Sequence, residues 1–167
     1  MMILSILPKT LALAAALATA PAAGALGTIH ITSASWSAGP GYMVYKGGAH
    51  LAAQNGATLD ADEVRLNFAG GAGTSGLANI VATGHVRAHL EEPASKLTYT
   101  LSSDKALYDP KTQRIDFDDP VTATVTSPYT LGPFTQTGQS AFVQLGKAPK
   151  YPLVTMNGIT ATFTPSQ

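Results

Sequence analysis

Residues 80–90 read IVATGHVRAHL, and every second position in this run is apolar or glycine. This alternation predicts a β-strand that buries one face and exposes the other. The run also contains one copy of an apolar-x-Ala repeat, whose leading residues lie 35, 35 and 38 positions apart at Leu51, Val86, Val121 and Ile159. A period of this size is typical of stacked supersecondary units that bury their apolar faces against one another.

The same alternation recurs along most of the chain beyond residue 26, whereas helical periodicity is hard to find. Val64, Leu66 and Phe68, for example, alternate with polar residues, and the chain contains 20 threonines, which suit half-exposed strands. The sequence therefore predicts an all-β fold in which about 8 to 10 strands form stacked antiparallel pairs in a solenoid-like roll.

Glycine, proline and acidic residues divide this pattern at regular intervals. Hairpin tips are predicted at Gly47-Gly48 and at residues 70–73, 109–111 and 146–152. The first strand of each two-strand unit is expected to begin near an acidic or amide residue: Asp62, Asp104 or Gln139. Asn157-Gly158 is interpreted as a bulge or turn.

The N-terminal part of this pattern is a leading strand over about residues 28–35, followed by a turn at residues 39–41. Trp36, Tyr42 and Tyr45 lie close together here. Such a cluster could stack on a sugar, but we interpret it as an end cap of the roll.

Composition excludes several classes of function. Charged residues make up 12% of the 167 residues, and the formal net charge is zero. There is thus no broad basic surface for nucleic acid. The chain contains no cysteine, which excludes disulfides and cysteine-ligated metals.

The first 25 residues differ from the rest of the chain. A short segment with one lysine precedes an alanine-rich apolar stretch, and Ala23-Gly24-Ala25 fits a small-x-small cleavage site. We interpret residues 1–25 as a cleaved secretory signal peptide, and residues 26–167 as one domain. The alternative is an uncleaved membrane anchor, for which the apolar stretch is short. Export without cysteine favours the bacterial periplasm.

Residue types that carry chemistry are sparse and scattered. His85 and His89 are about 13 Å apart along the expected strand, too far to share a metal ion without a bend. His50 and His85 occupy equivalent positions in successive repeats and are interpreted as a solvated ladder. Asp116 and Asp118 share a strand face that we interpret as solvated, because a calcium site needs more oxygen ligands. We therefore expect no catalytic residue, no bound metal and no cofactor, and we do not expect the protein to be an enzyme.

Three segments resemble the OstA-like, or lipopolysaccharide-transport A/C, family. Residues 82–88 resemble its A-x-G-x-V element, residues 103–115 its S/A-D-x-A-x-Y-D hairpin, and residues 59–64 its L-x-A-D-x-V element. The resemblance implies a half-open, twisted β-jellyroll in the periplasm. It also implies a role in moving lipopolysaccharide from the inner to the outer membrane, with members joining end to end or joining partner proteins built from the same jellyroll.

In such a fold the inward residues would line an apolar groove for acyl chains of lipopolysaccharide or a related lipid. The candidates are Val64, Leu66, Phe68, Ile80, Ala82, Val86, Tyr99, Leu101, Ile115, Phe117, Val121, Met156 and Ile159. The same residues suit a filled core, and the sequence leaves both open. Alternatives to a soluble bridge are a membrane-anchored adaptor of the same family, a secreted β-roll enzyme acting on polysaccharide, and an adhesin.

Overall fold

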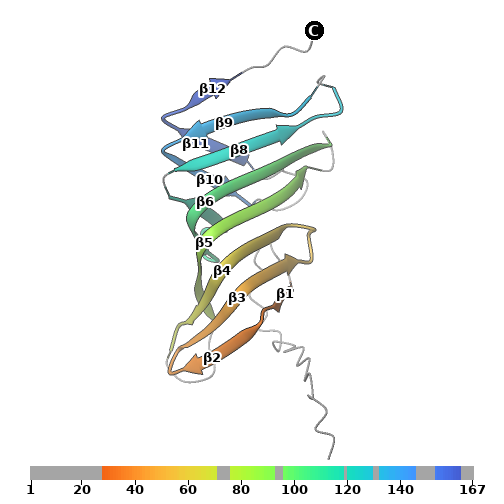
Figure 1. Ribbon diagram of the computed structural model, residues 1–167. Helices are drawn as coiled ribbons and strands as arrows, with labels where there is room; N and C mark the ends of the chain where they lie inside the picture. Colours follow the sequence, from red (N-terminus) through yellow and green to blue (C-terminus); the bar gives the residue numbers. More distant parts are fainter. Residues whose placement is uncertain are drawn as a thin grey trace, which may run out of the picture.

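The computed structural model describes residues 28–70, 76–92, 96–118, 120–129, 132–145 and 153–162, and these residues form twelve strands of one antiparallel sheet (Figure 1). The strands are β1 (Ile29–Thr32), β2 (Ser35–Gly39), β3 (Tyr42–Ala53), β4 (Thr58–Phe68), β5 (Leu77–Glu92), β6 (Leu97–Asp109), β7 (Arg114–Phe117), β8 (Val121–Thr126), β9 (Phe134–Gly138), β10 (Ser140–Gln144), β11 (Leu153–Asn157) and β12 (Thr160–Thr162). The predicted all-β class is confirmed.

The sheet bends into two arms. In the first arm the order is β1, β3, β4, β5, β6, β8, β9, β12, and in the second it is β2, β3, β4, β5, β6, β7, β10, β11. The long strands β3 to β6 run through both arms, and Figure 1 shows β10 and β11 behind β8 and β9. The molecule is therefore an elongated jellyroll whose two ends carry β1–β2 and β11–β12.

The two arms meet at a corner, and the pairing of the long strands is irregular where they cross it. The register of β3 against β4 shifts between Lys46 and Ala49, and that of β5 against β6 shifts between Thr83 and Val86. In β5 the extra residue is accommodated by positive φ angles at Gly84 (75°) and His85 (47°). A β-bulge of this kind bends a strand without ending it.

The prediction of a hairpin tip at Gly47-Gly48 is wrong. Both glycines lie inside β3, with φ angles of 79° and 81°, and they form the bulge of that strand. The tip at residues 109–111 is confirmed, because β6 and β7 pair on either side of it. The tips predicted at residues 70–73 and 146–152 lie largely outside the described residues, although the strands that flank each of them pair.

Strand number and strand starts also differ from prediction. Twelve strands form instead of the predicted 8 to 10, because three outer strands break at the corner into β7–β8, β9–β10 and β11–β12. Gln139 does precede a strand, whereas Asp62 and Asp104 lie inside β4 and β6. Glycine with φ of 63° at position 158 separates β11 from β12, as predicted. The leading strand is present as β1 and β2, which a turn at Pro40-Gly41 joins to β3.

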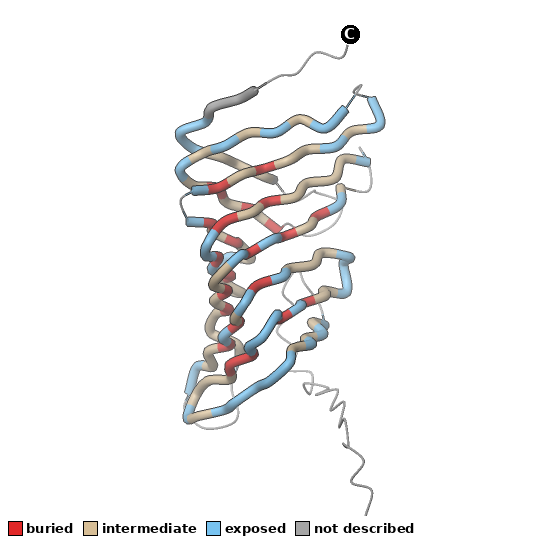
Figure 2. Tube along the Cα trace, viewed as in Figure 1, coloured by how far each residue is buried: buried red, intermediate tan, exposed pale blue. Residues whose placement is uncertain are grey.

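One hydrophobic cluster fills the space between the arms, which we call the interior. Its largest fully buried side chains come from both arms: Leu101 and Val121 from the first, Val64, Phe117 and Val143 from the second, and Val86 at the corner. Figure 2 shows buried positions along the strands, interspersed with exposed positions, and exposed positions at many strand ends. Burying a Val, Leu or Phe side chain stabilises a fold by about 1.5–3 kcal/mol, so this cluster holds the arms together.

The proposed signal peptide, residues 1–25, lies outside the described residues. In the described ranges we find no helix whose length and apolar character would allow it to cross a membrane.

Candidate functional site

The predicted groove residues converge on the interior, with one exception. Nearly all are buried or partly buried: Val64, Leu66, Ile80, Ala82, Val86, Leu101, Ile115, Phe117 and Val121 are buried, and Phe68, Tyr99 and Met156 pack against them. Ile159 is 50% exposed and lies between β11 and β12, so its assignment to the groove was wrong. The bulge at Gly158 shifts this copy of the repeat out of the strand.

Cross-strand pairing places the inward residues in continuous rows. One row of the second arm runs through Trp36, Tyr45, Val64, Ala82, Ala106, Phe117, Ala141 and Met156. Apart from the aromatic residues at its β2–β3 end, this row is aliphatic or phenylalanine and carries no charge. The interior is thus an apolar strip that follows the long axis of the molecule.

Sequence reasoning missed several residues of this strip. Leu90, Tyr108, Val143 and Leu145 are buried in the same cluster. The alternation that revealed Val86 and Ile115 extends to Leu90 and Val143, so that signal was sufficient. Tyr45, predicted as part of an end cap with Trp36 and Tyr42, is instead buried on β3 with 3% of its surface exposed, whereas Trp36 is 49% exposed.

Ser103 and Tyr45 place hydroxyl groups in the interior, and only one of the two has a hydrogen-bond partner among the described residues. Ser103 is buried, and its hydroxyl donates to the carbonyl of Lys105 at 2.8 Å. The Oη atom of Tyr45 is buried and has no hydrogen-bond partner in the part of the chain that the structure describes. Leaving a buried hydroxyl unpaired costs about 1–3 kcal/mol, and among the described residues only the Tyr45 hydroxyl is a buried side-chain group in this state.

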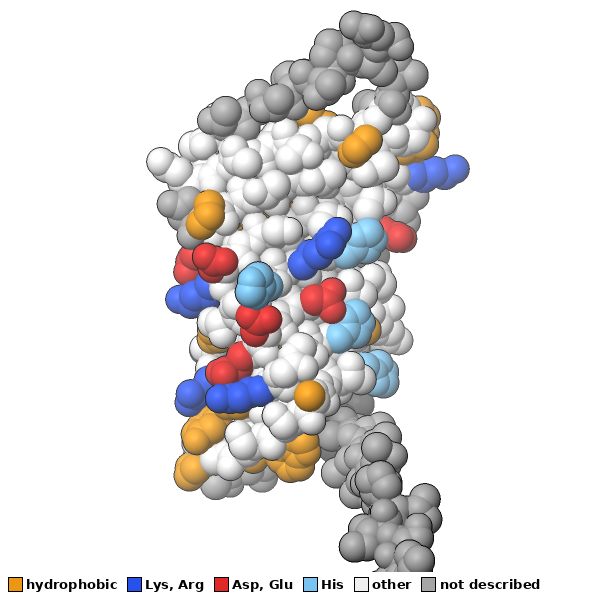
Figure 3. Space-filling view, viewed as in Figure 1, with side chains coloured by type: hydrophobic (Ala, Val, Ile, Leu, Met, Phe, Trp, Pro, Cys, Tyr) orange, Lys and Arg blue, Asp and Glu red, His pale blue; other side chains and the backbone are white. Residues whose placement is uncertain are grey.

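The outer face carries the charged side chains. Figure 3 shows histidine, acidic and basic groups gathered over the middle of the visible face, and hydrophobic groups at its lower end over β2 and β3. The Nδ1 atoms of His50 and His85 lie 2.7 and 2.8 Å from carboxylates of Asp60 and Asp62. The side-chain hydrogen bond and the charge of Asp62 raise the pKa of His85 above 6.5. The two histidines therefore pair with aspartates of β4 rather than with each other.

Asp116 and Asp118, which were predicted to share a solvated face, both form ion pairs whose side chains are partly exposed. Arg114 bridges to Asp116 two residues along the same strand, with 2.7 Å between Nε and Oδ1, and its guanidinium lies over the Phe142 ring. Asp118 pairs with Lys105 at 3.4 Å. No group of three or more metal-ligating side chains occurs within the described ranges.

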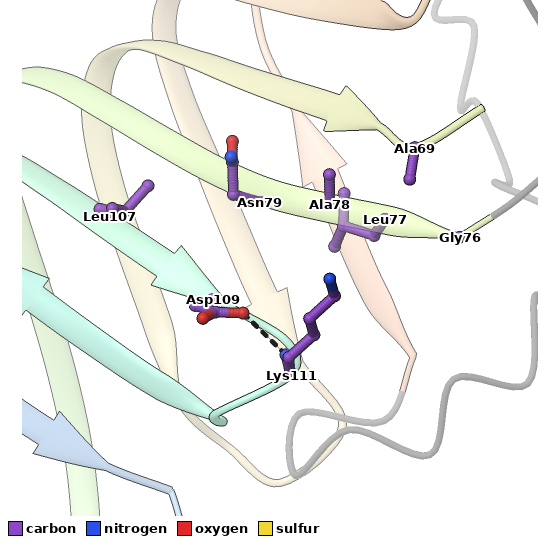
Figure 4. A pocket seen from close by; sticks show the side chains of 8 residues that line it. All are labelled: Ala69, Gly76, Leu77, Ala78, Asn79, Leu107, Asp109 and Lys111. Atoms are coloured by element: carbon purple, nitrogen blue, oxygen red, sulfur yellow. Dashed lines mark hydrogen bonds between the residues drawn. The ribbon is translucent and has the colours of Figure 1, made fainter. Parts of the chain in front are cut away.

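A surface depression of about 390 Å³ lies at the tips of the β4–β5 and β6–β7 hairpins (Figure 4). Its walls include Leu77, Asn79, Leu107 and Lys111, whose backbone N–H donates to Asp109 at 2.8 Å. None of the predicted groove residues lines it. This depression therefore lies outside the predicted groove, although Leu77 on its wall also packs against the hydrophobic cluster.

The two ends of the molecule carry unpaired strand edges. Among the described strands, β1 and β2 pair only with β3, β11 pairs only with β10, and β12 pairs only with β9. A strand with one free edge can accept a strand from another molecule. Both arms end in this way, so each end presents two free edges.

These features define an LptA-like β-jellyroll: an open, twisted antiparallel sheet folded around one apolar interior. The fold is similar to that of LptH, the LptA-homologous periplasmic component of the lipopolysaccharide transport device of Pseudomonas aeruginosa, with a TM-score of 0.62. The match covers 83% of this chain and 96% of LptH at 14% identity, and at that identity it shows the fold alone. No model of a known protein family matches the chain. No curated protein matches it either.

Proposed function

We propose that this protein is a periplasmic bridge that shields the acyl chains of lipopolysaccharide, or of a related lipid, in its interior during transport from the inner to the outer membrane. The observation that carries the proposal is the continuous apolar strip between two arms of an LptA-like jellyroll. The free edges at both ends support it, because they suit end-to-end contact with further jellyrolls.

Lipid entry requires the arms to separate. Val64, Leu101 and Phe117 are no more than 1% exposed, so the interior is closed around its own side chains. The arms are joined where the long strands cross the corner, and among the described strands no other pairing links one arm to the other. Acyl chains therefore enter between the strand ends far from the corner as the arms move apart.

The favourable free energy of binding an acyl chain comes from the burial of its apolar surface. Each methylene that leaves water contributes about 0.8 kcal/mol, so ten methylenes contribute about 8 kcal/mol before the costs of association are subtracted. The apolar lining offers the methylenes of an acyl chain similar contacts along most of its length, so a chain can slide along the strip. The direction of transport then comes from an energy source elsewhere in the assembly.

Site-specific photo-crosslinking tests the proposal. A photoreactive amino acid at Val86 or Phe117 faces the interior, whereas the same group at Arg87 or Asp116 faces the outer surface. We expect lipopolysaccharide to be captured at the first pair and not at the second. Equal capture at both pairs would contradict the proposal. N-terminal sequencing of the exported protein separates a cleaved soluble bridge from a membrane-anchored adaptor.

A further inference from the structure

The Tyr45 hydroxyl is the feature of the interior that packing does not explain. The side chain is 3% exposed, and its Oη has no partner among the described residues. Ser103, the buried polar residue of the same interior, satisfies its hydroxyl on the Lys105 carbonyl. A phenylalanine at position 45 would fill the same space without an unpaired donor, so packing among the described residues gives the hydroxyl no role.

The position of Tyr45 restricts what a partner from outside the chain can be. Tyr45 lies in register with Trp36 on β2 and with Val64 on β4, at the β1–β2 end of the strip. Trp36 is 49% exposed, so this end is where the strip meets solvent. A group that reaches Tyr45 therefore lies at this end of the interior and belongs to a molecule that is otherwise apolar.

The hydroxyl is available as a donor throughout the neutral range. Burial raises the pKa of Tyr45 above 10.0, so the phenol keeps its proton. The complementary group must then be an acceptor. A charged phosphate or carboxylate is disfavoured, because no cationic side chain lies on the row of Tyr45 and an unpaired ion in apolar surroundings is costly.

We infer that the β1–β2 end of the interior binds acyl chains that bear a neutral oxygen acceptor, an amide or ester carbonyl or a chain hydroxyl, and that Tyr45 Oη donates to this oxygen. The inference rests on the proposed function, since it requires an acyl chain in the interior. Tyr45 would thus distinguish N- or O-acylated glycolipids from molecules with a plain hydrocarbon chain.

Two probes with the same chain length and a similar sugar test this inference. N-tetradecanoylglucosamine carries an amide carbonyl, whereas S-tetradecyl thioglucoside has only a weakly accepting sulfur beside the chain. Trp36 is the single tryptophan and lies in register with Tyr45, so its fluorescence reports binding of either probe. The proteins are the full chain, Tyr45→Phe, and Tyr129→Phe as a control, because Tyr129 is 80% exposed and lies outside the hydrophobic cluster.

We expect Tyr45→Phe to bind the amide probe about 3- to 10-fold more weakly than the wild-type protein, as the loss of one hydrogen bond predicts. Binding of the thioglucoside should stay within about 2-fold, and Tyr129→Phe should bind both probes as the wild type does. The ligand-free Tyr45→Phe protein should melt at the same or a higher temperature than the wild type, because an unpaired hydroxyl has been removed.

Other outcomes overturn the inference. If Tyr45→Phe changes the affinity for both probes equally, or for neither, the hydroxyl does not recognise the carbonyl, although binding by the wild type still supports a lipid-carrying interior. A clear drop in melting temperature with no change in probe preference shows that the hydroxyl serves the fold. If the wild-type protein binds neither probe, the proposed function itself fails.

Discussion

Gly84 and Asp62 lie against each other across the corner of the bent sheet, so closely that a β-carbon on Gly84 would come within 2.9 Å of the Asp62 Cβ atom. Gly84 also has a φ angle of 75°, which residues with a side chain rarely adopt. Two independent constraints therefore require glycine at the bulge of β5. The same corner brings the two arms together around the interior.

Replacing Gly84 by alanine should destabilise the protein by about 2–4 kcal/mol, because strain in φ and overpacking act together. Gly56 provides a matched control, since its φ angle is 87° and no atom lies within 4 Å of a β-carbon built there. Gly56→Ala should cost only about 1–2 kcal/mol from backbone strain. Urea denaturation followed by circular dichroism measures the free energy of unfolding of the two variants and of the wild type. Equal losses for the two variants would show that the contact with Asp62 does not matter.

His85 should titrate above its ordinary pKa of 6.5, because its hydrogen bond to Asp62 and the charge of that carboxylate favour the protonated ring. A raised pKa in the folded state stabilises the fold below the unfolded value near 6.5, and this contribution is lost as pH rises through the folded value. The side chain is 90% exposed, so the effect on stability is small. Proton NMR of the imidazole measures the midpoint.

The variant Asp62→Asn is the control for that titration. It removes the charge but keeps a side chain of the same shape, so the midpoint of His85 should move down towards 6.5. An unchanged midpoint would mean that Asp62 does not set the pKa of His85.

End-to-end assembly should be visible by disulfide trapping, because the natural chain contains no cysteine. Ser37 on β2 and Thr155 on β11 lie on the two edge strands of the second arm, in the same outward row. The double variant Ser37→Cys with Thr155→Cys should form a ladder of covalent multimers on oxidation. Non-reducing gel electrophoresis at increasing protein concentration shows the ladder.

A control for this experiment places one cysteine away from an edge. Arg87 lies on β5, which has a neighbouring strand on both sides. Ser37→Cys with Arg87→Cys should therefore give no ladder. Multimers of the same length from both double variants would argue for random collision instead of contact between edges.

Period-two alternation was sufficient to predict the strands and most of the interior from sequence. Ile80, Ala82, Val86, Ala88 and Leu90 keep one parity along β5, and all five are buried. The pattern is local, because successive side chains of a strand point to opposite faces whatever the strand pairs with. The turn before β7 was also predictable, since Asp109 accepts a hydrogen bond from the backbone of Lys111 and closes the turn locally.

Only the tertiary structure decided where the sheet bends. In β4 the buried residues change parity between Ala61 and Val64, whereas β5 keeps its parity because the extra residue at Gly84 and His85 compensates. Glycine readily adopts a positive φ angle, and such a residue can either end a strand or form a bulge within it. The sequence of Gly47-Gly48 is therefore compatible with a hairpin tip as well as with the bulge that the structure contains. The choice depends on whether the next residues continue beside the same neighbouring strand, and that pairing joins residues far apart in the chain.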